Sequence, residues 1–146
     1  MPRHFTLTEA RALLPSAGRL IREAVSAKSR YQQAETYMRE LAQRILMLGG
    51  MFVDTTAAEA WKTQRDSSGQ TLKQTLEKIE EMGVLVKDLD IGLVDFPTIY
   101  RGEEVYLCWR MDEADIEHWH GIHEGFAGRK EIDRHFIEHH RGEETV

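Results

Sequence analysis

The sequence predicts an α+β fold in which a long antiparallel helical hairpin, similar to a coiled coil, precedes a small antiparallel β-meander. Two observations support this prediction. Apolar residues follow a 4-3 spacing from Leu13 to Leu48, which is typical of a long helix with a packed seam. After Gly83 the spacing alternates, and β-branched and aromatic residues become frequent, as in strands. We therefore expect a single domain over residues 1–146, with the helical hairpin at 7–82 and the meander at 84–120.

The first helix should begin at about Leu7. Thr6 and Glu9 match a capping box, in which the Thr6 hydroxyl accepts a hydrogen bond from a backbone amide and Glu9 reaches back. Pro15 cannot donate a helical hydrogen bond and disfavours helical geometry at Leu14, so we expect a break or kink there. The apolar seam positions of this helix are Leu13, Ala17, Leu20, Ala24, Ala27, Tyr31, Ala34, Met38, Leu41, Ile45 and Leu48.

A second helical region should cover residues 55–82. Its polar segment at 66–69, Asp-Ser-Ser-Gly, is flexible enough to divide the region in two. The segment 72–82 should then fold back antiparallel on the first helix. Because so short a helix cannot cover the whole seam, we expect a homodimer formed through the long helices.

The strands should follow Gly83, in three stretches rich in β-branched and aromatic residues: 84–86, 93–96 and 105–109. Arg101-Gly102 between the last two stretches is typical of a tight hairpin turn. We expect a meander of about three antiparallel strands, which a fourth strand at residues 115–120 would extend. Residues 121–132 should form a loop containing Gly and Arg, and residues 133–146 a flexible tail that begins with one or two amphipathic turns.

Charge and composition limit the classes of partner. The net charge is −6, with eight basic against four acidic residues in positions 1–44 and eleven against twenty-one in positions 45–146. This acidity argues against nucleic acid as a partner. No apolar run approaches the ~20 residues of a membrane span, and we expect neither a membrane partner nor a secretory leader. Cys108 is the only cysteine, which fits a reducing cytoplasm, and we expect it to be a small buried hydrophobe.

The densest group of metal-binding and proton-transfer side chains lies in residues 112–129. Its members surround Trp119 and are Glu117, His118, His120, His123 and Glu124. If this segment is a helix, Glu117, His120 and Glu124 share one face, with the spacing that di-iron and di-manganese carboxylate sites use. The group contains no complete catalytic signature, so the catalytic residues stay unknown.

If the segment is a strand, His118 and His120 point to the same side of a sheet. This two-histidine face would bind zinc, iron or copper together with Asp95 or Glu104 from neighbouring strands. The glycines that follow the histidines favour this second geometry. We therefore predict a divalent metal (Zn, Fe or Mn) held by Asp95, His118 and His120, and the alternative is that these histidines lie on the surface or are hydrogen-bonded.

Two further residues belong to the candidate site. Asp95 shares a strand face with apolar residues, and a buried carboxylate needs a cation, a metal or a donor as partner; the alternative is a carboxylate that caps an amide beside Pro97. Arg129 follows two glycines and would bind an anion, either a carboxylate or a phosphate, through its guanidinium. The alternative for Arg129 is an ion pair with an acidic neighbour while Phe126 fills the core.

Four separated blocks of the chain resemble a bacterial family catalogued as domain of unknown function 2203. They are HFTLTEARALLP at residues 4–15, GVLVKD and GLVDFP within residues 83–97, VYLCWR at residues 105–110, and the closing WH with GFAGR at residues 119–129. The resemblance covers nearly all of residues 4–132. It implies a small cytosolic protein and no particular activity.

The sequence thus supports two hypotheses about function. In the first, the chain is a small cytosolic structural or protein-interaction module that self-associates through its long helices, and the histidines are architectural. In the second, it is a metal-dependent hydrolase or oxidoreductase with a divalent metal near His120. Close approach of Asp95 and His120, beside a solvent-accessible pocket, would favour the second.

Overall fold

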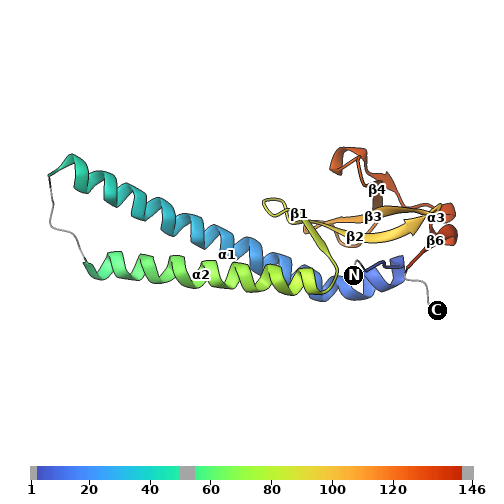
Figure 1. Cartoon of the computed structure of the whole chain (residues 1–146), viewed down its shortest axis with the longest axis horizontal. Coiled ribbons are helices and arrows are strands. Elements are labelled where there is room, and N and C mark those ends of the chain that lie inside the picture. The colour runs from blue at the N-terminus through green and yellow to red at the C-terminus, as the bar shows by residue number, and fades with distance from the viewer. Residues whose placement is uncertain (1–2, 50–54, 143–146) are drawn as a thin grey trace.

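Two long helices lie side by side and extend beyond a sheet at one end of the molecule (Figure 1). The computed structural model describes residues 3–49 and 55–142. The helices are α1 (Leu7–Met47) and α2 (Thr55–Glu81), and together with the antiparallel sheet they confirm the α+β class. Within the described residues, no helix combines the length and the apolarity that crossing a membrane requires.

Helix α1 begins where the capping box predicts. The Thr6 hydroxyl accepts the N–H of Glu9, and the Glu9 carboxylate accepts the N–H of Thr6. Of the break or kink expected at Pro15, the break is wrong, because Pro15 lies inside the continuous helix. Leu14 and Ala17, on either side of it, are buried in the core. Their packing holds both halves of the helix in place and outweighs a proline cost of about 3 kcal/mol.

Helix α2 is also continuous, which corrects the expected division at residues 66–69. The Ser68 hydroxyl donates to the carbonyl of Gln64 one turn earlier, so its polar group is satisfied within the helix. A Cβ at Gly69 would lie 3.2 Å from the ring of Tyr31, which belongs to α1. These small residues therefore form the surface through which α2 approaches α1, and they do not interrupt the helix.

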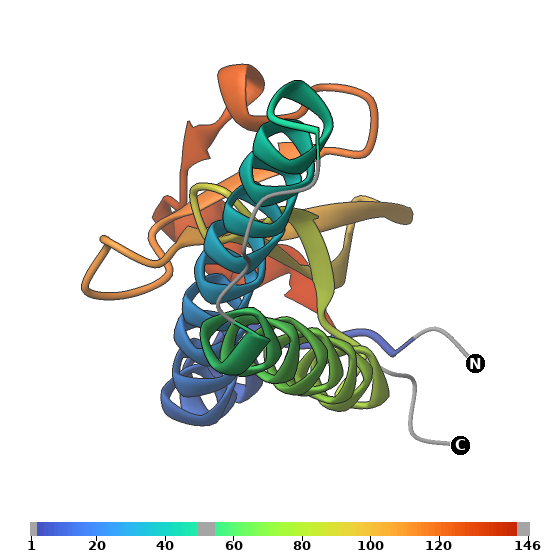
Figure 2. The ribbon, with the colours of Figure 1, turned by 90° about the vertical axis from the view of Figure 1, so that its left-hand side faces the viewer.

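The seam predicted on α1 lies against α2 of the same chain. The ring of Tyr37 stacks on Trp61 with 4.9 Å between centroids, and the carbonyl of Arg30 accepts a hydrogen bond from Gln64. The helices lie closest beside the sheet and separate toward their far ends (Figure 1), and the view along them shows the same divergence (Figure 2). The seam residues in the diverging part are only half-buried, namely Met38, Leu41 and Ile45.

The sheet is antiparallel, and its first five strands pair in chain order. These strands are β1 (Leu85–Asp88), β2 (Leu93–Tyr100), β3 (Glu103–Arg110), β4 (His118–Gly121) and β5 (Lys130–Glu131). Arg101 and Gly102 join β2 to β3 and both have positive φ, 55° and 77°, as a tight hairpin turn requires. β4 begins later in the chain than expected, and β5 falls within the segment predicted to be a loop.

Alternation along the strands gives the sheet two different faces. One face packs on α1, and its core includes Phe5, Ile21, Phe96, Leu107 and Trp109. Asp95, Cys108 and His120 lie on the opposite face, to which Arg110 also belongs. The guanidinium of Arg110 lies over the ring of Phe126, at the start of the short 3-10 helix η1 (Phe126–Gly128), so η1 covers part of this second face.

The C-terminal segment contains the short helical stretch expected there, but a strand follows it where a flexible tail was expected. Arg134–His139 form α3, and His140–Arg141 form β6, which pairs with β2. Phe136 of α3 is fully buried in the core. The ring Nε2 of His140 accepts the N–H of Leu7 at 2.8 Å, so this segment completes the first turn of α1. Residues 143–146 of the expected tail lie outside the described residues.

Candidate functional site

Asp95, Cys108 and His120 lie next to one another on three neighbouring strands. The β2–β3 ladder pairs Asp95 with Cys108, and β4 adds His120 on the same face. One ligand atom from each residue lies within 4.8 Å of those of the other two. All three residues are buried, since Asp95 and Cys108 are 0% exposed and His120 is 3% exposed. The sequence left open whether the segment around His120 is a helix or a strand, and β4 is a strand.

Both ring nitrogens of His120 face hydrogen-bond acceptors. Nδ1 lies 2.8 Å from the carbonyl oxygen of Gly121, which can only accept, so Nδ1 carries a hydrogen. Nε2 lies 3.0 and 3.1 Å from the two carboxylate oxygens of Asp95. A neutral imidazole would direct its Nε2 lone pair at a carboxylate. The lone pair and the carboxylate would repel each other. Asp95 and His120 must therefore hold one further proton, or another cation, between their side chains.

Burial dominates the protonation of this group. It raises the pKa of the Asp95 carboxyl, and the neighbouring His120 offsets part of that rise. Burial, followed by the charge of Asp95, raises the pKa of the Cys108 thiol to about 12, so the thiol is protonated at neutral pH. The Cys108 sulfur and a carboxylate oxygen of Asp95 lie within 4.8 Å of each other. Taken as protein groups alone, the three side chains form a closed, protonated network without the solvent exposure of a general acid or base.

His118 is half-buried and contacts a different pair of residues. Its Nδ1 lies 2.9 Å from Nη2 of Arg129 and 3.4 Å from the Glu113 carboxylate. The sequence grouped His118 with Asp95 and His120 as a metal ligand. The structure brings the last two together and places the His118 side chain beside the Glu113–Arg129 ion pair instead.

Arg129 is engaged by Glu113. Its Nη2 lies 2.7 Å from both carboxylate oxygens of Glu113, and its guanidinium lies 4.9 Å from the centroid of the Phe126 ring. Phe126 does not fill the core, because it is 38% exposed. Among the described residues, Nε of Arg129 is buried without a hydrogen-bond partner. An anion at the predicted Arg129 site would therefore compete with Glu113 for the guanidinium.

The other acids considered for the site lie elsewhere. Glu104 is near His4, with 3.5 Å between the carboxylate and Nε2. Glu124 accepts hydrogen bonds from Lys130, and these lower the pKa of its carboxyl. Because β4 is a strand, the helical face that would have joined Glu117 to Glu124 does not form.

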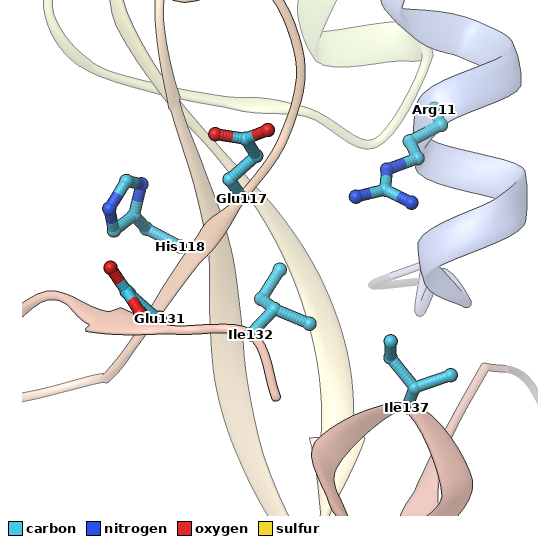
Figure 3. Close-up of a pocket in the computed structure, with 6 residues that line it drawn as sticks. All are labelled: Arg11, Glu117, His118, Glu131, Ile132 and Ile137. Carbon is cyan, nitrogen blue, oxygen red and sulfur yellow. The ribbon is translucent and has the colours of Figure 1, made fainter. Parts of the chain in front are cut away.

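A pocket opens beside β4, between α1 and α3 (Figure 3). The residues that line it are Arg11, Glu117, His118, Glu131, Ile132 and Ile137. Arg11 projects into this space from α1, donates to the carbonyl of Ile116 at 2.9 Å and lies 3.3 Å from the Asp115 carboxylate. Neither Asp95 nor His120 lines this pocket. The pocket and the buried Asp95–Cys108–His120 group are thus separate features.

Cys108 is the member of the buried group that the sequence analysis left out. It is a small buried residue, as expected, but it faces a carboxyl and an imidazole as well as apolar side chains. A signal for its position was present in the sequence. The two-residue turn at Arg101-Gly102 fixes the register of the flanking strands, and counting outward from that turn places Cys108 opposite Asp95.

Comparison with known proteins places the chain in a family. The model of a family described as an uncharacterized conserved protein, DUF2203, matches residues 3–132. No curated protein and no solved structure matches the chain.

Proposed function

The chain belongs to the DUF2203 family of uncharacterized conserved proteins, and on that premise we propose that it is a protein-interaction module that self-associates into a homodimer. The binding element is the two-helix arm, defined as residues 31–48 and 55–68, which extends beyond the sheet (Figure 1). The sheet end anchors both helices and fixes the direction in which the arm projects.

The thin interior of the two-helix arm is the observation that carries this proposal. Within its described residues, only Ala34 of α1 and Ser68 of α2 are buried. Leu46, Met47 and Leu48, at the far end of α1, are 82%, 84% and 60% exposed. Because helices in water depend on packing of an apolar face, a second copy that covers these side chains would stabilise the arm.

A surface aromatic pair on the arm supports an interface. Tyr37 and Trp61 stack on each other beside a shallow groove, and both are half-buried. The other residues along this groove are Ser29, Gln32, Gln33, Thr36 and Glu40. Tyrosine and tryptophan are enriched in protein interfaces, where they supply large contact areas.

The charge of the arm favours a second copy over a strongly charged partner. The chain as a whole has a net charge of −6. Basic and acidic residues nevertheless balance within the arm, which contains Arg39, Arg44, Lys62 and Arg65 against Glu35, Glu40, Glu59 and Asp66. Two identical arms therefore meet without net repulsion, while the sheet ends, which carry the excess negative charge, stay apart.

We do not favour the hydrolase or oxidoreductase alternative. A catalytic group must reach its substrate, and enzyme sites are concave pockets that admit one. Asp95 and His120 are 0% and 3% exposed, which leaves no surface at which a small molecule could meet them.

Sedimentation velocity at tens of micromolar tests the proposal. We expect a species of twice the chain mass of 16.9 kDa, since a homodimer with a substantial interface resists dilution to this range. A species of monomer mass throughout that range would rule the proposal out.

A charge-matched pair of variants locates the interface. Leu46→Glu with Met47→Glu places two charges at exposed positions of the arm and should dissociate the dimer without unfolding the monomer. Thr8→Glu with Ala12→Glu adds the same charge at exposed positions at the sheet end of α1 and should leave the dimer intact. Equal dissociation by both variants would place the interface outside the arm.

A further inference from the structure

We propose that Asp95, Cys108 and His120 form a binding site for one divalent transition-metal ion of the zinc class. The site is independent of the two-helix arm and of dimer formation. Its ligand atoms would be one carboxylate oxygen of Asp95, Sγ of Cys108 and Nε2 of His120, which lie within 4.8 Å of one another.

The positions of the three ligands are fixed by strand pairing. Each comes from a different strand of one antiparallel sheet, and the β2–β3 register places Asp95 directly opposite Cys108. Bonds of about 2.0–2.3 Å to zinc separate tetrahedral ligand atoms by about 3.3–3.8 Å. The ligand atoms of Asp95, Cys108 and His120 would therefore need to approach one another by only about 1 Å. Small side-chain rotations supply this movement.

His120 already has the orientation of a metal ligand. Metal-binding histidines typically donate their second ring N–H to a carboxylate or a backbone carbonyl, which fixes the tautomer and directs the other nitrogen at the metal. Here Nδ1 donates to the carbonyl of Gly121 at 2.8 Å, and Nε2 is directed toward Asp95. In the neutral ring, the Nε2 lone pair has no hydrogen-bond donor facing it, and this lone pair would bind the ion.

A divalent cation also balances the charge of this buried group. A thiolate at Cys108, a carboxylate at Asp95 and a neutral His120 together carry two negative charges, which one divalent ion neutralises. Without the ion, the same neutrality needs a proton on Cys108 and a second proton shared between Asp95 and His120. Metal binding should therefore release about two protons per ion near neutral pH.

The ligand chemistry selects the class of metal. Thiolate and imidazole favour zinc, cobalt and related transition metals over magnesium and calcium, which prefer oxygen ligands. Three protein ligands leave one tetrahedral position for water. Because all three residues are buried, the ion would stabilise the β2–β3–β4 part of the sheet without taking part in turnover.

Cobalt(II) provides a direct test, because Cys108 is the only cysteine and any thiolate-to-cobalt charge-transfer band must arise from it. The full chain would be made without an affinity tag, in a His135→Ala/His139→Ala background. This background is needed because the two rings stack 4.1 Å apart on exposed residues and could bind metal themselves. Unfolding and refolding the reduced chain with Co²⁺ lets the ion enter the closed site. We expect one equivalent of bound cobalt and a thiolate charge-transfer band.

Matched variants distinguish metal binding at Asp95, Cys108 and His120 from binding at the neighbouring His118. Cys108→Ala, a small apolar replacement at a buried position, should remove the band and lower affinity for Co²⁺ at least tenfold, and Cys108→Ser serves if the alanine variant does not fold. His118→Ala should leave both unchanged, because His118 contacts Glu113 and Arg129 instead. No band in the refolded parent chain, or equal cobalt affinity in the parent and Cys108→Ala, would overturn the proposal.

Proton release gives a second measurement that needs no variant. Refolding the reduced chain in weakly buffered solution with Zn²⁺ should release about two more protons per ion bound than refolding it without the ion. Adventitious binding to surface imidazoles would release less than one, because it ionises no thiol. Release below one proton per ion would count against Cys108 as a ligand. Absence of Zn²⁺ binding would overturn the proposal, and Asp95 and His120 would then be only a proton-sharing pair.

Discussion

Asp95 and Cys108 are cross-strand partners, and the turn at Arg101 and Gly102 sets their pairing. The turn joins Tyr100 to Glu103, and every later pair of the β2–β3 ladder follows from that first one. A slip of one residue would turn Asp95 to the core face, because side chains alternate along a strand. The backbone conformation of two exposed turn residues thus determines the composition of a buried polar group.

Replacing Gly102 by Ala should weaken the fold through the backbone alone. Gly102 has φ of 77°, and nothing lies within 4 Å of the Cβ that alanine would add, so no side-chain clash contributes. We expect the free energy of unfolding, measured with urea, to fall by about 1 kcal/mol. Arg101→Asn is the control, because asparagine tolerates positive φ, and it should leave stability unchanged or slightly higher. A Gly102→Ala chain as stable as wild type would contradict this account.

Replacing Pro15 by Ala should stabilise the protein. Pro15 is exposed in the interior of α1, and alanine would restore a backbone hydrogen bond to the carbonyl one turn earlier. We expect the urea midpoint to rise by an amount equivalent to about 1–3 kcal/mol, with an unchanged m-value. Arg19→Ala, at another exposed position of α1, should change stability by less than about 0.5 kcal/mol. A lower midpoint for Pro15→Ala would show that the proline is favourable where it lies.

Replacing His120 by Ala should cost far more than replacing His118. Without His120, the Asp95 carboxyl keeps, among the residues that the structure describes, only the Cys108 thiol as a close polar neighbour in a site with 0% exposure. We expect the free energy of unfolding to fall by about 3–5 kcal/mol. His118→Ala should cost less than about 1 kcal/mol, because its partners Glu113 and Arg129 still pair with each other. Similar losses for the two variants would mean that the Asp95–His120 contact contributes little.

Cys108 should resist thiol reagents until the protein unfolds. Its pKa of about 12 means that about one thiol in 10,000 is ionised at pH 8, against roughly a quarter of unperturbed cysteines. The side chain is also 0% exposed. With a chromogenic disulfide reagent, we expect labelling only at the rate of unfolding, and immediate labelling in denaturant. Rapid stoichiometric reaction of the native protein would contradict the burial of the thiol.

Local patterns in the sequence predicted much of the fold. The capping box at Thr6 placed the start of α1 correctly, and alternation after Gly83 predicted antiparallel strands. Local patterns failed where contacts with residues distant in the sequence determine the local structure. Pro15 stays helical because its neighbours are anchored in the core, and Gly69 stays helical because it fits against Tyr31, which belongs to the other helix.

The site was predictable to the extent that strand alternation determines it. Alternation identified Asp95 and His120, which the structure brings to 3.0 Å. It could not show that the His118 side chain lies beside Arg129, because that contact depends on how residues 121–129 cover the sheet. The apolar and aromatic residues around Cys108 predict a buried hydrophobe, and only the hairpin register shows that Cys108 lies opposite Asp95.

The contact between Leu7 and His140 has a consequence for how the chain is made. The two residues are 133 positions apart, and the ring of His140 accepts the first amide hydrogen of α1. During synthesis this helix start emerges from the ribosome early, but its acceptor is translated more than a hundred codons later. Contacts between such distant segments slow folding, because the intervening loop must close first. The last step of folding should therefore follow release of residue 140, and nascent chains that stall before it should fray at α1 and be cut there by proteases.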